Sequence, residues 1–273
     1  MNRKHILTAA CLMSTITLAV TSCGGGGSSE AESEAIFPRE IQVMDSKTIF
    51  TTDSAGRVTR LATTEGDYES LVEFEYGNFR EDGNYQARMT WTDNEEPGTR
   101  SEIYLMLDDD GCAVYARDTR NARDEWWMEY NDDNRLEYVR HTGGENSETR
   151  ITYADGDLSA VTVRDMDSGV ESSFTFTYTD GDHDTPMANM MAMMPPMVVL
   201  PVYPGDLEPA FNAGLLGKPS RNLPLRRVYT GADDQGLTDY MAWTLDDTGF
   251  PTRVVISDPT LTGVNSMAIT FVR

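Results

Sequence analysis

Hydrophobic and polar residues alternate along short segments through most of this 273-residue chain. The segment around residue 74 places Val72, Phe74 and Tyr76 between glutamates, and Phe174 and Phe176 stand between serines and threonines. A period of two residues is typical of a β-strand that buries one face and exposes the other. The chain lacks the 3.6-residue period of a long amphipathic helix, so the pattern predicts an all-β fold.

Pairs of alternating segments are joined by turns rich in aspartate, glycine and asparagine. These hairpins recur at residues 48–61, 102–116, 125–140, 149–164 and 241–257, and a looser copy surrounds Gly83. Glycine and asparagine accept the positive φ of tight hairpin turns, and aspartate hydrogen-bonds its own turn backbone. We expect about fourteen strands in a curled antiparallel meander, an open or partial barrel, that forms a single domain over residues 47–273.

One irregular segment interrupts the hairpins. Residues 187–217 are apolar, with six methionines between 187 and 197 and prolines at 195, 196, 201 and 204. Proline lacks the N–H that a strand contributes to a sheet, and the apolar face of a curled sheet must be covered. We expect this segment to pack in the concavity of the sheet, against Phe174, Phe176 and Trp126.

An integral membrane barrel would show the same alternation of residues. The strands expected here run about six or seven residues, whereas a membrane strand needs roughly nine to eleven. The turns are also short at both ends of the predicted hairpins. These features favour a β structure outside the bilayer.

The first 23 residues have the organisation of a secretory signal. Arg3 and Lys4 precede an apolar run that is too short to span a bilayer, and small residues then lead to Cys23. This end is similar to the lipobox of bacterial lipoproteins, in which the cysteine after the cleavage site carries lipid. We expect a signal peptide over residues 1–22, a lipid on Cys23 and a flexible tether over residues 23–46. The alternative is a plain secreted protein in which Cys23 is incidental.

Composition narrows the classes of partner and chemistry. A formal net charge of −23 argues against a nucleic-acid partner, because phosphate binding needs clustered Lys and Arg. The chain carries no dinucleotide fingerprint, P-loop, zinc-binding cysteine cluster or nucleophile elbow. We therefore expect no cofactor and assign no catalytic residue.

Two runs of residues resemble metal ligands. The methionine run, with His183 nearby, offers the soft thioethers that Cu(I) prefers. Asp180, Asp182 and Asp184 resemble the start of a calcium loop, but the glycine and glutamate that such a loop needs further on are absent. Adaptable packing accounts for the methionines and a solvated turn for the aspartates, so we expect no metal site.

Other side chains could act on or bind a ligand. Paired carboxylates on a β scaffold can hydrolyse glycans, but 45 acidic residues give no means of choosing a pair. His141 and His183 lie in polar, turn-like surroundings. Alternation places Trp127 on the polar face of its strand, where an exposed indole can stack on a ligand. We expect a ligand platform at Trp127, and we assign the remaining tryptophans, Trp91, Trp126 and Trp243, to the core.

The stretch Gly214-Leu215-Leu216-Gly217-Lys218, followed by Asn222-Leu223-Pro224, resembles a known family. It is similar to a family of Bacteroidetes lipoproteins of unknown function (DUF4595-like), in which hairpins flank a GLLG…NLP stretch. The resemblance covers residues 47–273 and implies a porin-like β fold and a place in the cell envelope. It implies no activity, and the methionine-rich run departs from the pattern.

These observations lead to one expectation about function. The protein is expected to be lipid-anchored in the bacterial cell envelope, at the outer membrane, and to meet the membrane through its N-terminal lipid. It is expected to act as a non-catalytic binding or scaffolding module for a glycan or protein ligand. The alternatives are an envelope hydrolase acting on glycans or peptides and a methionine-type copper protein.

Overall fold

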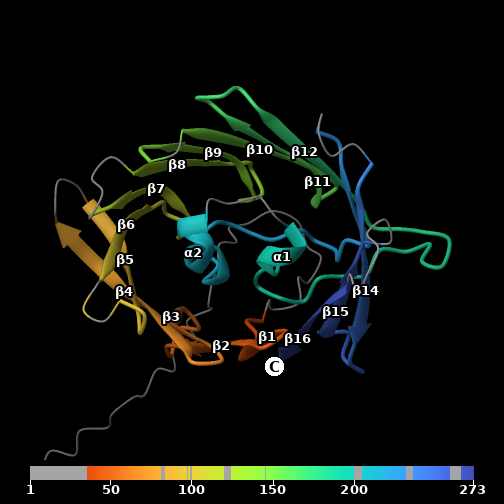
Figure 1. Ribbon diagram of the computed structural model, residues 1–273, viewed down its shortest axis with the longest axis horizontal. Coiled ribbons are helices and arrows are strands. Elements are labelled where there is room, and N and C mark those ends of the chain that lie inside the picture. Colours follow the sequence, from red (N-terminus) through yellow and green to blue (C-terminus); the bar gives the residue numbers. More distant parts are fainter. Residues whose placement is uncertain are drawn as a thin grey trace, which may run out of the picture.

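The computed structural model describes residues 36–80, 84–96, 98, 100–119, 124–144, 146–199, 205–231, 236–258 and 266–273. Across these residues, sixteen antiparallel strands form one closed barrel around two short helices (Figure 1). The first strands are β1 Glu40–Val43, β2 Ser46–Thr52, β3 Val58–Glu65, β4 Tyr68–Arg80, β5 Asn84–Asp93, β6 Ser101–Leu107, β7 Ala113–Asp118 and β8 Glu125–Tyr130. The others are β9 Leu136–Thr142, β10 Ser147–Ala154, β11 Asp157–Asp165, β12 Glu171–Thr177, β13 Arg226–Tyr229, β14 Thr238–Leu245, β15 Pro251–Ser257 and β16 Ser266–Val272.

The barrel closes because β1 pairs with both β2 and β16. Ile41 lies opposite Thr48 on one side and Phe271 on the other. The all-β prediction is confirmed, but the expected open or partial barrel of about fourteen strands is wrong. Hairpin signals specify only neighbouring strands, whereas the closing pair joins the two ends of the chain. β1 also lies within the range predicted as tether, so the barrel begins before residue 47.

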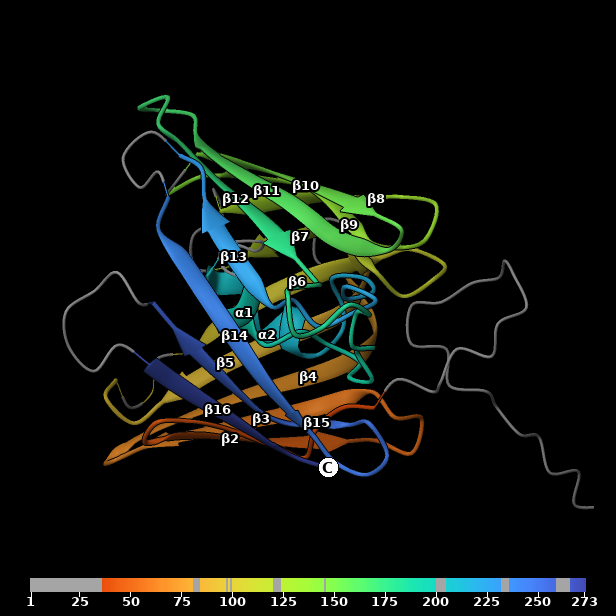
Figure 2. The same cartoon turned by 90° about the vertical axis from the view of Figure 1, so that its right-hand side faces the viewer.

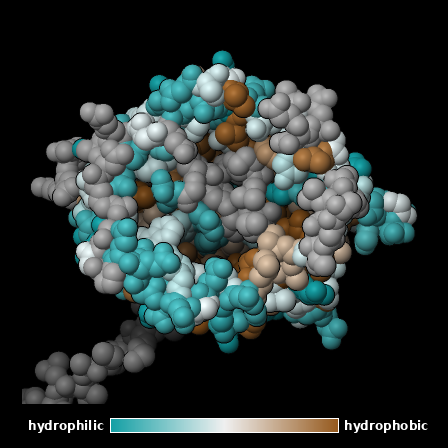
Figure 3. Space-filling model, in the orientation of Figure 1, coloured by the Kyte–Doolittle hydropathy of each residue, from teal (hydrophilic) through white to brown (hydrophobic). Residues whose placement is uncertain are grey.

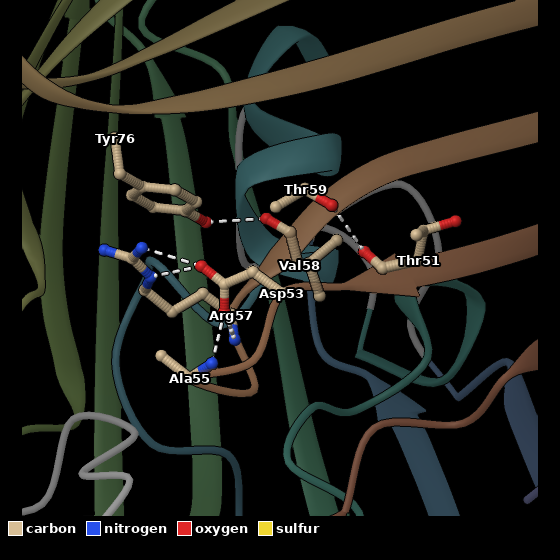
Figure 4. A network of polar contacts seen from close by, with 7 residues as sticks. All are labelled: Thr51, Asp53, Ala55, Arg57, Val58, Thr59 and Tyr76. Atoms are coloured by element: carbon tan, nitrogen blue, oxygen red, sulfur yellow. Dashed lines mark hydrogen bonds and ion pairs between the residues drawn. The ribbon is translucent and has the colours of Figure 1, made fainter. Parts of the chain in front are cut away.

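Four hairpin turns share one hydrogen-bond pattern. In the first (Figure 4), Asp53 Oδ1 accepts hydrogen bonds from the backbone N–H groups of Ala55 (2.9 Å) and Arg57 (3.0 Å). Gly56, between those two donors, takes a φ of 78°. The same two bonds and a positive φ recur in the turns that begin at Asp108, Asn131 and Asp246. The turn signal in the sequence therefore has a specific structural cause.

The two faces of the wall differ sharply in polarity. On β4, Val72 and Phe74 face the lumen and are buried, while Glu73 and Glu75 face outward and are exposed. Outward-facing charges form ion pairs between strands, such as Arg88 with Glu75 at 2.6 Å. Figure 3 looks into one mouth of the barrel. Among the coloured residues, hydrophilic ones cover most of the rim and hydrophobic ones lie around the central hollow. A membrane-spanning barrel carries its apolar band on the outside, which is the reverse arrangement.

The methionine- and proline-rich segment packs inside the barrel (Figures 1 and 2). We call the described residues between Met187 and Leu225 the plug; it contains α1 (Pro196–Val199), the 3-10 turn η1 (Gly205–Leu207) and α2 (Glu208–Asn212). Barrels of about sixteen strands enclose a lumen too wide for wall side chains to fill. Three methionines of the plug, Met191, Met193 and Met194, are at most 2% exposed and share one core with Phe174, Phe176 and Trp126. No helix in the described part of the chain is long and apolar enough to cross a membrane.

Backbone hydrogen bonds join the plug to the wall at the end where the repeated turns lie. Lys218 N–H donates to the Asn134 carbonyl at 2.8 Å, and Arg221 N–H donates to the Gly156 carbonyl at 3.0 Å. The beginning of the described chain is held there too, because Ile36 N–H donates to the Met190 carbonyl at 3.1 Å. The plug is thus bound to the turns as well as packed among apolar side chains.

The two glycines of the GLLG stretch stand where the plug meets its neighbours. Gly214 and Gly217 have φ angles of 74° and 84°, a region that favours glycine. A Cβ on Gly217 would lie 2.7 Å from the Asn134 carbonyl oxygen, and one on Gly214 would lie 2.8 Å from the Phe37 ring. Leu215 and Leu216, between them, are buried. The motif therefore combines a tight backbone approach with two apolar anchors.

Polar side chains hold the other parts of the plug. Asp157 Oδ1 accepts the backbone N–H of Asn222, and Asp157 Oδ2 accepts its side-chain amide, both at 2.8 Å. Near α1, the buried Arg227 guanidinium donates to Asp239 at 2.9 Å and to the Val198 carbonyl at 3.2 Å. Pairing and hydrogen bonding of this kind are what make a buried charge tolerable.

Candidate functional site

Trp127 lies on the outer face of β8 with 36% of its surface exposed. In the sheet it stands opposite Tyr115 of β7 and Arg140 of β9. The Tyr115 ring centroid is 5.6 Å from that of Trp127, and the Arg140 guanidinium is 5.9 Å from the indole centroid. The position on the polar face is as alternation indicated, and the ligand platform at Trp127 stays a prediction.

Further aromatic rings continue from Trp127 across the neighbouring strands. Tyr115 lies 6.3 Å from Tyr85, Tyr85 lies 5.5 Å from Tyr104, and Tyr104 lies 6.1 Å from Phe79, all between ring centroids. Tyr104 faces outward because its strand neighbours Ile103 and Leu105 face the core. The five contacting rings form the outer aromatic patch: Phe79, Tyr85, Tyr104, Tyr115 and Trp127.

A small pocket opens within this patch. Tyr85, Tyr104, Arg117 and Thr119 line a volume of about 60 Å³. Pockets that enclose a whole small molecule usually measure about 300–1,000 Å³, so this one has room only for a substituent of a larger ligand. Tyr85 and Tyr104 are buried at 4% and 7% exposure, which makes the pocket the deep part of the patch and Trp127 its open part.

Hydrogen bonds fix the polar ends of the aromatic side chains. The Tyr115 hydroxyl donates to Glu125 Oε1 at 2.8 Å. Burial and this bond raise the pKa of the Tyr115 hydroxyl, so it stays a protonated donor. The hydrogen bond to Glu75 is the main cause that raises the pKa of Arg88, and a bond to Tyr104 adds to it. The side chains in and beside the patch thus include oriented hydrogen-bond donors and acceptors, and both positive and negative charges.

The other tryptophans lie on the inner side of the wall. Trp126 is fully buried and stacks on His141, with ring centroids 4.8 Å apart. Trp91 and Trp243 pack against the core, and Trp243 Nε1 donates to the Pro224 carbonyl of the plug at 2.8 Å. His141 is itself buried in β9, so the expected polar turn is wrong there; its place in the strand, two residues after Val139, turns it inward.

The metal-like runs have structural roles. Met191, Met193 and Met194 are packed among apolar side chains, and Met187 and Met190 lie against the same core. Asp180 accepts the N–H groups of Asp182 and His183 and pairs with the His183 ring at 2.9 Å, in an exposed turn. The hydrogen bond from His183 is the main cause that lowers the pKa of Asp180. Within the described ranges, no group of three or more His, Cys, Asp or Glu side chains could hold a metal ion.

The remaining predicted positions bear less directly on the patch. Cys23, the predicted lipid site, lies outside the described residues, as does Gly83. Cys112 is buried, and its backbone N–H donates to Asp108 in one of the repeated turns. The four side chains that line the pocket include no carboxylate, so the pocket does not provide the acid pair that a hydrolase of this type uses.

Sequence reasoning missed the pocket residues Tyr85, Tyr104 and Arg117. Tyr104 stands in the run Ile-Tyr-Leu-Met-Leu, where continuous apolarity hides which side chains face outward. Tyr85 on β5 pairs with Phe79 on β4, beyond a register shift that lies between Tyr76 and Phe79. Alternation within one strand cannot anticipate such a shift. The one available signal was that Tyr104 shares the face of Glu102.

Comparison with known proteins gives the fold and no more. No protein-family model matches the chain, and no curated protein matches it. A porin-like protein from Bacteroides uniformis ATCC 8492 is similar in structure, with a TM-score of 0.63 and 19% identity over 86% of this chain and 96% of that one. A porin-like protein from Bacteroides vulgatus ATCC 8482 has a TM-score of 0.50 and 12% identity over 86% and 97%. This chain therefore has the fold of Bacteroides porin-like proteins.

Proposed function

We propose that this chain is a lipid-anchored, non-catalytic binding protein of the bacterial cell envelope, at the outer membrane. Its plugged barrel stands outside the bilayer and binds its ligand at the outer aromatic patch. One observation carries the proposal: an exposed indole, Trp127, is linked through Tyr115 to a tyrosine-lined pocket on the outer face of the wall. Contiguous apolar surface around an exposed aromatic side chain is a common mark of an interaction site.

The polarity of the barrel supports a scaffold rather than a channel. The lumen is filled by the plug, whose methionines are buried and whose backbone is bonded to the turns. The wall carries charged residues such as Arg60, Glu73 and Arg150 on its outer face. Placing one of these arginines against lipid near the middle of the bilayer would cost about 2–4 kcal/mol, and placing the glutamate there would cost less.

The signal-like N-terminus and the likeness to Bacteroides structures support the envelope location. A barrel with a charged wall needs another means of attachment, and lipid on Cys23 would provide it. Several acyl chains on one cysteine give the hydrophobic area that stable anchoring requires.

The anchor is tested by Cys23→Ser. We expect the wild type in the membrane fraction and marked by a radioactive fatty acid. The variant should take up no label and should leave the membrane fraction, because its attachment is lost. A wild type that takes up no fatty acid would contradict the lipid anchor.

The binding site is tested with Trp127→Ala and a matched control, Tyr240→Ala. Tyr240 is 46% exposed on β14, away from the patch, so its loss removes an aromatic surface without touching the site. The probes are three immobilised classes: uncharged polysaccharides, a polyuronate and a proline-rich peptide. Retention of wild type and the control on one of them, lost in Trp127→Ala, supports the proposal. Equal retention of all three proteins, or of none, contradicts it.

A further inference from the structure

We infer that the ligand of the outer aromatic patch is an uncharged glycan that stacks one sugar ring on Trp127 and extends over Tyr115, so that a group further along the glycan enters the pocket beside Tyr85 and Tyr104. This inference rests on the proposed function and names the class of ligand. Two features of the site support it: the fixed position of the indole and the polar groups beside the patch. Two features of the whole molecule support it as well: its net charge and the closure of its sheet.

The indole of Trp127 is held in place before any ligand arrives. Tyr115 packs against it at 5.6 Å with the rings tilted by 58°, and Arg140 lies 5.9 Å from its centroid. The face of a pyranose ring that carries its C–H groups is apolar and slightly positive, which suits the negative face of an aromatic ring. A side chain already fixed by its neighbours loses little conformational entropy on binding.

The groups around the indole suit hydroxyls, which both donate and accept hydrogen bonds. Arginines supply donors, glutamates supply acceptors, and Thr119 in the pocket lining can do either. Charges of opposite sign alternate across the patch: Arg117 stands opposite Glu125 in the sheet near Trp127, and Arg88, over the Phe79 ring at the other end, bonds Glu75 at 2.6 Å. A site with both signs in balance selects neither an anion nor a cation.

The charge of the whole molecule disfavours acidic polymers. At a formal net charge of −23, the field around the protein repels a polyanion as it approaches. Polyuronates and nucleic acids would meet this repulsion without a basic surface to offset it, since Arg88 and Arg117 beside the patch stand next to Glu75 and Glu125. An uncharged polymer approaches without this repulsion.

The closed sheet disfavours a peptide as the ligand. Extended peptides commonly bind by adding a strand to a free sheet edge. In this barrel β1 pairs with β16, which leaves no edge among the described strands. A proline-rich helix laid on the aromatic rings is the peptide mode that remains, and the experiment below includes it.

Affinity electrophoresis of the full-length protein tests the inference. The gels contain an α-glucan, a β-glucan, a mannan or a galactan, and separate gels contain polygalacturonate. A proline-rich peptide is titrated by fluorescence anisotropy. We expect at least one uncharged glycan to retard wild type and Tyr240→Ala equally, with affinity roughly tenfold lower for Trp127→Ala. Arg117→Ala should weaken binding as well, and added salt should change little, because an uncharged ligand makes no ion pair.

The other results overturn the inference in distinguishable ways. If wild type binds only polygalacturonate or the peptide, and Trp127→Ala loses that binding, the glycan inference falls while the proposed binding function stands. If none of the probes binds, or if Trp127→Ala binds as well as wild type, both are overturned. Circular dichroism spectra of each variant that match wild type exclude misfolding as the cause.

Discussion

One Asp or Asn side chain organises each of the repeated turns, through an oxygen that accepts two backbone N–H groups. Asp53 uses one oxygen for two backbone N–H groups and the other for the Arg57 guanidinium, at 2.7 and 2.9 Å (Figure 4). Arg57 in turn lies 4.4 Å from the centroid of Tyr76, whose hydroxyl donates to the Val58 carbonyl. The turn between β2 and β3 is thus tied to β4.

These contacts set the protonation of Asp53. Burial alone would raise its pKa, but hydrogen bonds from the Arg57 side chain and from the N–H groups of Arg57 and Ala55 outweigh it and hold the pKa below the usual value of 3.8. A carboxylate with a lowered pKa stabilises the fold at pH values above its unfolded pKa. That contribution is lost as the pH falls through the folded pKa.

Asp53→Ala and Asp53→Asn separate the two roles of this side chain. We expect Asp53→Ala to lower the free energy of unfolding by about 1 kcal/mol near neutral pH, and Asp53→Asn by less, because an amide oxygen still accepts the backbone bonds. In urea unfolding from neutral to acidic pH, the gap between wild type and Asp53→Asn should close as the pH drops below 3.8. A gap that widens on acidification would contradict this assignment.

Individual residues could be predicted from the sequence only where neighbouring residues fix which face they occupy. Trp126 and Met128 face the core, so the outward position of Trp127 between them follows. His141 was misplaced because the sequence does not show how far β9 extends past Arg140. Tyr85 escaped because the irregular pairing between Tyr76 and Phe79 is a property of two strands together.

At the level of elements, the plug depends on glycine where it meets the turns. Gly217→Ala should lower the free energy of unfolding by about 1–3 kcal/mol or more. The new Cβ would lie 2.7 Å from the Asn134 carbonyl oxygen, and alanine is also strained at the φ of 84°. Gly169→Ala is the matched control, with a φ of 74° and open space around it. It carries the backbone strain without the clash. Equal losses in urea unfolding would show that the plug does not press on the turn.

Burial of the methionines gives a second test of the plug. Met191 and Met194 are each 1% exposed, so Met191→Asp with Met194→Asp would bury two unpaired charges and cost several kcal/mol. Met44→Asp, at a residue 72% exposed, should leave the melting temperature nearly unchanged. A double variant that melts like wild type would mean that the segment is not packed in the lumen.

The hairpins and the packing of the irregular segment could be predicted because both follow from local composition. Turn chemistry marks each Asp/Gly hairpin, and proline with methionine marks a segment that is apolar but unable to join a sheet. Closure could not be predicted, since the pairing of Glu40–Val43 with β16 connects residues from opposite ends of the chain. Whether a meander closes depends on the number of strands and their stagger.

For the molecule as a whole, the distribution of polarity decides how it relates to a membrane. The apolar faces of the strands and the plug form one continuous core inside, and charged side chains such as Glu73, Glu75 and Arg88 stand outside. A net charge of −23 keeps such a surface well solvated. We therefore propose that the barrel stands in water and that the proposed lipid on Cys23 is its attachment to the bilayer.

Flotation with lipid vesicles distinguishes a barrel that stands in water from one that enters the bilayer. A chain starting at Gly24, produced without detergent, is mixed with outer-membrane lipid vesicles and centrifuged through a density gradient, beside the lipidated full-length protein. We expect the shorter chain to stay folded at the bottom of the gradient, with a β-rich circular dichroism spectrum, while the lipidated protein floats. A shorter chain that floats with the vesicles and resists carbonate extraction would show that the wall enters the bilayer and would contradict a barrel that stands in water.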